Sequence, residues 1–286
     1  MRVFLNSGGG QPYDPVVMGR IISVGFAGVR QGIPAGHRAL LLCDDLVQYT
    51  GVRPLLLLGS EIMAMGEPPP SFEALGRSAA RAVQITGLEG VTFEIGNEPD
   101  IATRYRYEPA LFTEAVVRAA HAIWDVLPGA RVVSGGVSNT NRRGLDYLRA
   151  AVRAGLPHVV IGFHSYRTHT TPDTPHDGFA CRQDEMAELR RIAAGRPLWN
   201  TETGWHTAEQ RLGWGRTLRW TDQQVADFVV QELAFLESEG VAVATVYQVT
   251  DGPTDTPFDR FGVWRVDGGE KPLARALRTF IQGESS

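Results

Sequence analysis

Eight short apolar runs, each followed by a longer stretch with helical spacing, constrain the fold of this chain more than any other feature. Their cores are almost continuously apolar, which is typical of strands buried on both faces in a parallel sheet. Eight strand–helix units in 286 residues predict an α/β fold, a single (β/α)8 TIM barrel over residues 1–286. A doubly wound open sheet is the alternative. The expected strands are Val3–Asn6, Gly25–Arg30, Pro54–Gly59, Val91–Asn97, Arg131–Gly135, His158–His164, Pro197–Glu202 and Val241–Gln248.

Helical patterns fill the intervals between these strands. Phe112–Trp124 and Val225–Leu236 each carry apolar residues along one stripe, as expected of helices packed on a barrel. Ser71 and Thr221 are expected to be helix N-caps, because a hydroxyl can accept a hydrogen bond from the free backbone amides of the first turn.

Loop lengths indicate which end of the barrel is functional. The connections from helix to strand are short, whereas those from strand to helix are long. Long ordered loops usually carry function, and in barrels the active site lies at the C-terminal ends of the strands. The long connections are Glu98–Glu108, Ser165–Ala180, Thr203–Trp220 and Val249–Glu270.

Composition excludes several classes of protein. A net charge of −4, with acidic and basic residues spread along the chain, provides no basic field for nucleic acid or an anionic membrane. The longest apolar runs are too short to span a bilayer. Cys43 and Cys181 are expected to be isolated thiols. No signal-peptide pattern precedes Val3, so we expect a cytoplasmic protein or the mature form of a processed one.

Two of the expected strands end in a glutamate. Glu98 follows the fourth strand and Glu202 ends the seventh, so both would lie at the mouth of the barrel. Two carboxyl groups about 5–5.5 Å apart are what a retaining glycosidase requires, one as nucleophile and one as acid/base. Alternatively, Glu98 caps the next loop and Glu202 forms a salt bridge to an arginine.

Together these motifs resemble those of clan A glycoside hydrolases, similar to families 5 and 39. Asn97-Glu98-Pro99 matches the acid/base motif of that clan, and Thr201-Glu202-Thr203-Gly204-Trp205 matches its nucleophile motif. His164-Ser165-Tyr166 matches the His-x-Tyr of strand six. The matches extend from Arg30, at the end of the second strand, to Lys271-Pro272, and the first strand matches nothing specific.

The resemblance implies a retaining hydrolase of β-O-glycosidic bonds without a cofactor or metal ion, acting on an oligo- or polysaccharide. Glu98 would be the acid/base and Glu202 the nucleophile. Many clan members end strand eight with a tryptophan that floors the cleavage subsite, and here Tyr247 or Gln248 stands in its place. The expected substrate-binding residues are Arg30, Asn97, His164, Tyr166, Trp205, Tyr247, Gln248 and Trp264.

Two other enzyme classes fail on specific absences, whereas two further alternatives stay open. A Schiff-base aldolase needs a strand-end lysine, but the single lysine, Lys271, stands near the final helix, and no His-x-His pair indicates a metal hydrolase. A transglycosylase and a carbohydrate-binding barrel without catalysis both fit the motifs.

Aromatic residues in the long loops are candidate sugar platforms, and arginines there suggest a preference for anionic sugars. The aromatic residues are Tyr105, Tyr107, Trp205, Trp214, Trp220, Phe258 and Trp264. The arginines are Arg104, Arg106, Arg142, Arg143, Arg167, Arg211, Arg216 and Arg219.

Overall fold

A computed structural model describes residues 1–7, 14–60, 63, 66–101, 107–211 and 217–283. Eight parallel strands pair in the order β5-β4-β3-β2-β1-β10-β7-β6. Bridges from Val133 to Val160 and from Val137 to Phe163 join β5 to the β6 side, so the sheet closes on itself. The strands are β1 (Arg2–Asn6), β2 (Gly28–Gly32), β3 (Arg53–Leu58), β4 (Thr92–Ile95), β5 (Arg131–Ser134), β6 (Ile161–His164), β7 (Leu198–Thr203) and β10 (Val243–Tyr247).

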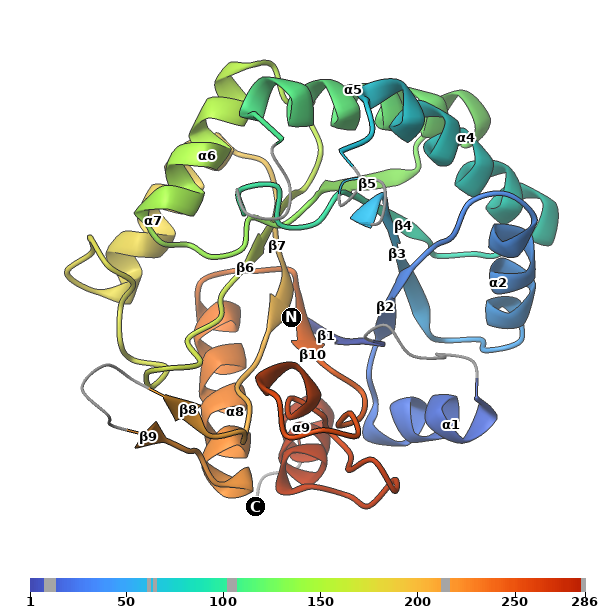
Figure 1. Cartoon of the computed structure of the whole chain (residues 1–286). Coiled ribbons are helices and arrows are strands. Elements are labelled where there is room, and N and C mark those ends of the chain that lie inside the picture. Colours follow the sequence, from blue (N-terminus) through green and yellow to red (C-terminus); the bar gives the residue numbers. More distant parts are fainter. Residues whose placement is uncertain (8–13, 61–62, 64–65, 102–106, 212–216, 284–286) are drawn as a thin grey trace.

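Helices surround this barrel on the outside, which confirms the predicted (β/α)8 TIM barrel (Figure 1). None of the helices described is long and apolar enough to cross a membrane. The helices are α1 (Pro15–Val24), α2 (His37–Val47), α4 (Pro69–Thr86), α5 (Pro109–Val126), α6 (Arg142–Arg153), α7 (Arg182–Ala193), α8 (Asp222–Ser238) and α9 (Pro272–Gln282).

Several predicted boundaries are corrected. The second strand begins at Gly28 rather than Gly25, because Gly25 takes a left-handed φ of 92° that ends α1. Ser71 is not an N-cap, since α4 already begins at Pro69. Thr221 does cap α8, in a reciprocal capping box with Gln224.

Two loops that follow strands carry local structure of their own. After β7, strand β8 (Gln210–Arg211) pairs antiparallel with β9 (Thr217–Leu218). After β10, a 3-10 turn covers Pro257–Asp259, and the buried Lys271 ammonium contacts both oxygens of Asp251 at 3.1 Å. This ion pair fastens the loop to the start of α9.

The barrel interior is divided into an apolar and a polar part. Six buried apolar residues form a cluster separate from the main core: Phe4, Leu55, Val133, Val160, Trp199 and Val243. Side chains two residues apart on a strand share a face, so Asn6 points inward like Phe4 but nearer the C-terminal end of β1. Polar groups therefore gather where the strands end.

Candidate active site

A bulge in β7 turns Glu202 toward the barrel axis. Phe163 and His164 are adjacent on β6, yet they pair with Asn200 and Glu202 on β7, and the β10 register shifts at the same place. An extra residue in one strand changes the side on which the following side chains point. Trp199 and Thr201 alternate inward, and the bulge adds Glu202 to the inward set.

Four side chains surround the Glu202 carboxylate. Its Oε1 accepts hydrogen bonds from Asn6 at 3.1 Å and from the Arg30 guanidinium. Its Oε2 accepts the Tyr166 hydroxyl at 2.6 Å and lies 3.7 Å from Nδ1 of His164. The carboxylate is therefore fixed in position by groups that stabilise its charge.

The protonation of this cluster follows from these contacts. Burial alone would raise the pKa of Glu202, but the charges of His164 and Arg30 and the Tyr166 hydrogen bond outweigh it and lower that pKa. Burial and the adjacent Glu202 hold the pKa of Tyr166 well above its usual value, so the phenol remains a donor. Burial lowers the pKa of His164, but the charges of Glu202 and Glu98 raise it by more than burial lowers it. The pKa of His164 is therefore raised overall.

Arg30 neutralises a second buried carboxylate. Its guanidinium contacts Glu94 on β4 through Nε at 2.5 Å and Nη2 at 3.2 Å, and Glu94 is fully buried. Nη2 also donates to Oδ1 of Asn97 at 2.8 Å. One cation on β2 thus holds the nucleophile candidate, a structural glutamate and the residue before Glu98.

Replacing this cation should strongly destabilise the fold. Arg30→Met leaves Glu94 and Glu202 buried without a counter-charge, and we expect a loss of about 3–5 kcal/mol in the free energy of unfolding. Arg190→Met, which breaks an exposed contact with Glu239, should cost less than about 1 kcal/mol. Urea denaturation at pH 7 measures both variants. Equal losses for the two would contradict the role given to Arg30.

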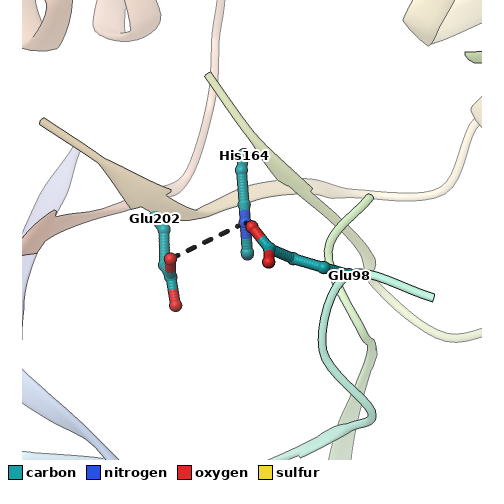
Figure 2. Close-up of side chains that lie close together, drawn as sticks. All are labelled: Glu98, His164 and Glu202. Carbon is teal, nitrogen blue, oxygen red and sulfur yellow. Dashed lines mark hydrogen bonds and ion pairs between the residues drawn. The ribbon is translucent and has the colours of Figure 1, made fainter. Parts of the chain in front are cut away.

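Glu98 lies opposite Glu202 on the loop after β4. Its backbone takes a left-handed φ of 49°, and its amide donates to the Gly136 carbonyl at 2.9 Å. Its Oε1 lies 3.1 Å from Nδ1 of His164, which stands between the two carboxyl groups (Figure 2). Oxygens of Glu98 and Glu202 and the His164 nitrogen all lie within 4.8 Å of one another. The two glutamates therefore meet at the barrel mouth.

Of the predicted substrate-binding residues, one group lies around Glu202, and a second group, the two tryptophans, lies away from it. Arg30, Asn97, His164, Tyr166 and Tyr247 line the cluster around Glu202: the Tyr247 ring lies 6.3 Å from that of Tyr166, and burial and Glu202 raise its pKa to about 12. Gln248 follows Tyr247 through a cis peptide bond and donates to the Phe258 carbonyl at 2.8 Å.

Two of the predicted sugar-binding tryptophans lie elsewhere. Trp205 is fully buried, packs against Phe228 and donates its indole N–H to the Thr170 carbonyl at 2.9 Å. Trp264 is only 3% exposed. Neither ring has a free face for a sugar, so both are removed from the set of binding residues that we propose.

The other candidate platforms and the loop arginines give a similar result. Tyr107 is buried and Trp220 donates to the Thr168 carbonyl, whereas Phe258 is 67% exposed. Arg167 is buried in an ion pair with Glu185, and Arg143 donates to the Asp100 carbonyl. These arginines hold protein groups, which weakens the expectation of anionic sugars. Tyr105, Trp214, Arg104, Arg106 and Arg216 lie outside the described residues.

Three residues of the site were missed in the sequence. Asn6 ends the strand that matched no motif, and Glu94 looked like an ordinary strand residue beside the Asn97-Glu98-Pro99 motif. Gly136 directly follows the expected strand Arg131–Gly135, and a side chain there would lie 2.5 Å from the His164 ring. The inward alternation of β1 and β4 is the signal that could have found Asn6 and Glu94.

A buried charge network supports the segment that carries Tyr166. Glu185 on α7 contacts Nη2 of Arg167 at 2.8 Å and Nδ1 of His176 at 2.9 Å. Burial would raise the pKa of Glu185, but the His176 hydrogen bond and the Arg167 charge lower it to about 2.

This low pKa predicts a specific loss of stability in acid. Because the folded-state pKa is about 2 against an ordinary 4.5, Glu185 stabilises the fold above pH 4.5. About 3 kcal/mol is then lost as the pH falls toward 2. Glu185→Gln should be less stable at pH 7 but lose less over that interval. Urea denaturation across this pH range tests it, with the exposed Glu114→Gln as control. Parallel curves for Glu185→Gln and wild type would contradict it.

Among the described residues, one cluster could offer three ligands to a metal ion, namely Glu98, His164 and Glu202. The Glu202 carboxylate already contacts the Arg30 guanidinium. A divalent cation would add a second positive charge against a buried one, so this donor set does not favour a metal centre.

Comparison with solved structures identifies the fold. A family 39 glycoside hydrolase from Bacteroides cellulosilyticus WH2 superposes with a TM-score of 0.75 at 17% identity, covering 98% of this chain and 63% of that one. The chain shares its barrel with family 39 glycoside hydrolases. A monomeric β-xylosidase from Caulobacter crescentus CB15 gives a TM-score of 0.69 at 17% identity, covering 97% of this chain and 67% of that one.

A solved structure of similar length to this chain also superposes on it. An active-site mutant of a Rhizomucor miehei β-1,3-glucanosyltransferase, in complex with laminaritriose, gives a TM-score of 0.69 at 14% identity, covering 95% of this chain and 96% of that one. This chain spans about 63% of the length of the Bacteroides protein. No protein-family model and no curated protein matches the sequence.

Proposed function

We propose that this protein is a retaining glycoside hydrolase that cleaves β-O-glycosidic bonds through a covalent glycosyl-enzyme. The observation that carries the proposal is the approach of Glu98 and Glu202, with one oxygen of each within 4.8 Å at the C-terminal end of the barrel. Retaining enzymes hold their carboxyl groups about 5–5.5 Å apart, whereas inverting enzymes need about 6.5–9.5 Å to admit a water molecule.

Glu202 has the environment of the nucleophile. Its pKa is lowered despite burial, so it is ionised when substrate arrives. Asn6, Arg30 and Tyr166 fix both of its oxygens, and attack on the anomeric carbon requires that fixed position. The carboxylate loses its charge when it bonds to the sugar and regains it when that bond breaks. The same donors then stabilise Glu202 as the leaving group.

Glu98 has the environment of the acid/base. Its side chain is 19% exposed against 10% for Glu202, so water reaches it more readily. In the first step Glu98 gives its proton to the leaving oxygen while Glu202 bonds to the anomeric carbon. In the second step Glu98 takes a proton from water, whose oxygen displaces Glu202 and regenerates both groups.

We propose that Asn97 orients the sugar. Its side-chain oxygen accepts from Arg30, which leaves its amide nitrogen to donate to a hydroxyl of the substrate. Tyr247 lies beside Tyr166 and Phe261, at ring distances of 6.3 and 5.3 Å, and forms an aromatic wall at the position where clan members often have tryptophan. We propose that the Tyr247 ring replaces this tryptophan as the aromatic surface on which the sugar at the cleavage subsite rests.

A transglycosylase is the second candidate, because the barrel also matches the glucanosyltransferase over nearly the full length of both chains. Both activities share the covalent intermediate and differ in whether water or a sugar hydroxyl attacks it. A carbohydrate-binding barrel without turnover is the non-enzymatic alternative.

A substrate panel tests the proposal. Purified protein is incubated with β-linked polysaccharides, oligosaccharides and aryl β-glycosides, and products are identified by mass. Hydrolysis predicts shorter products only, whereas transglycosylation also predicts products longer than the substrate. Binding to an oligosaccharide without any product would contradict both and favour the non-enzymatic barrel. Glu202→Gln serves as the inactive control.

A further inference from the structure

The Tyr166 backbone is held from behind the active site. Its hydroxyl donates to Glu202, while its carbonyl accepts hydrogen bonds from Nε2 of His176 at 3.1 Å and Nδ2 of Asn139 at 3.0 Å. A phenol reaches a fixed acceptor only if its own backbone is fixed. The position of Tyr166 relative to Glu202 therefore depends on these two donors.

His176 faces an oxygen acceptor with each ring nitrogen. Nδ1 lies 2.9 Å from Oε1 of Glu185, and Nε2 faces the Tyr166 carbonyl. The Thr140 hydroxyl lies 3.2 Å from Nδ1 and itself donates to Glu185. A carboxylate and a carbonyl are both acceptors, so each ring nitrogen of His176 faces a group to which an N–H can donate. His176 thus links α7 to the Tyr166 backbone.

The residues on both sides of Tyr166 are fastened to the same charges. Arg167 contacts both oxygens of Glu185 at 2.8 Å and lies 3.7 Å from Glu232. Ser165 donates to Glu232 at 2.8 Å. Glu185 and Glu232 are fully or almost fully buried, and this rigid ionic layer leaves the segment little freedom.

We propose that His176 is a positioning residue, which holds the Tyr166 hydroxyl on the Glu202 carboxylate through the Tyr166 backbone. The inference rests on the proposed function only for its effect on turnover. Its direct effect is on the ionisation of Glu202, because the Tyr166 hydrogen bond stabilises the charged form. Loosening Tyr166 should make Glu202 a weaker acid.

The experiment follows the Glu202 carboxyl directly, by ¹³C NMR titration of protein labelled at glutamate, with the signal assigned from Glu202→Gln. His176→Ala should raise the pKa of Glu202 by about one unit, the scale of a hydrogen bond to a charged group. His176→Gln keeps an uncharged donor for the Tyr166 carbonyl and should restore most of the shift. Asn139→Ala, which removes the other donor, should shift it in the same direction.

A double-variant cycle separates positioning from a general effect on the fold. In a Tyr166→Phe background, His176→Ala should add nothing to the shift, because the hydroxyl that it positions is gone. His121→Ala, on the outer surface of α5, is the matched histidine control and should leave the titration unchanged. An equal shift with and without the Tyr166 hydroxyl, or no shift at all, would overturn the proposal. If the substrate panel shows no turnover, the titration of the Glu202 carboxyl still tests the positioning role of His176.

Turnover gives a second readout. The acid limb of kcat/KM should move upward with the Glu202 titration in His176→Ala, and kcat/KM at neutral pH should fall about tenfold. A fall in activity in proportion to the loss of folded protein, with an unchanged pH profile, would mark His176 as merely structural and contradict the proposal.

Discussion

Glu202→Gln should abolish glycosyl-enzyme formation for every leaving group. A neutral amide cannot attack the anomeric carbon, so we expect kcat/KM to fall by about 10⁵–10⁶-fold, the scale seen when a hydrolase loses its covalent nucleophile. The loss should be similar for aryl glycosides and natural glycosides, since bond formation to Glu202 precedes departure of both. Initial rates on the two substrate types measure it.

Two controls keep this result tied to the chemistry. Glutamine can still accept from Asn6 and Arg30, so the variant should remain folded, which near-UV circular dichroism and thermal melting verify. Glu209→Gln, an exposed glutamate on the loop after β7, should retain full activity. A Glu202→Gln enzyme with more than about a hundredth of wild-type activity would exclude Glu202 as nucleophile.

Glu98→Gln should separate substrates by their leaving group. Natural glycosides need a proton from Glu98, and we expect a loss of about 10²–10⁴-fold. Aryl glycosides with good leaving groups, such as nitrophenolates, should lose much less in the first step. The intermediate then accumulates, because the base that activates water is missing, and a burst of nitrophenolate should precede slow turnover.

A small anion should rescue this variant. Azide needs no general base, so it should attack the intermediate of Glu98→Gln and restore turnover with a β-glycosyl azide as product. The matched Glu202→Gln variant forms no such intermediate and should not give a β-azide. An α-azide from Glu98→Gln, or equal losses for good and poor leaving groups, would mean that the roles are reversed or the chemistry is inverting.

The strand pattern predicted the barrel well because buried parallel strands leave a direct trace in the sequence. All eight expected strands are present, with ends shifted by three residues at most. The largest shifts, at Gly25 and His158, occur where a turn carries residues that resemble strand residues. The pairing of β8 with β9 left no such trace, because two-residue strands are too short to show alternation.

The site was predictable only where motifs lie in one segment. Glu98 and Glu202 were found because each stands in a local motif. Asn6 and Glu94 stand in no motif, and only the inward alternation of β1 and β4 marks them in the sequence, because they act through contacts across the barrel. The bulge that turns Glu202 inward depends on the register of three strands. Trp205 was misjudged because an aromatic residue at the end of the Thr201-Glu202-Thr203-Gly204-Trp205 motif looks the same in the sequence whether its ring is exposed or packed.

The anomeric form of the first product tests the central claim most directly. Proton NMR of wild-type enzyme acting on an aryl β-glycoside in D₂O follows the released sugar before mutarotation. A double displacement through Glu202 predicts that the β anomer appears first and the α anomer only later, at the rate of uncatalysed mutarotation. Initial release of the α anomer would show a single displacement by water and contradict the mechanism proposed for Glu98 and Glu202.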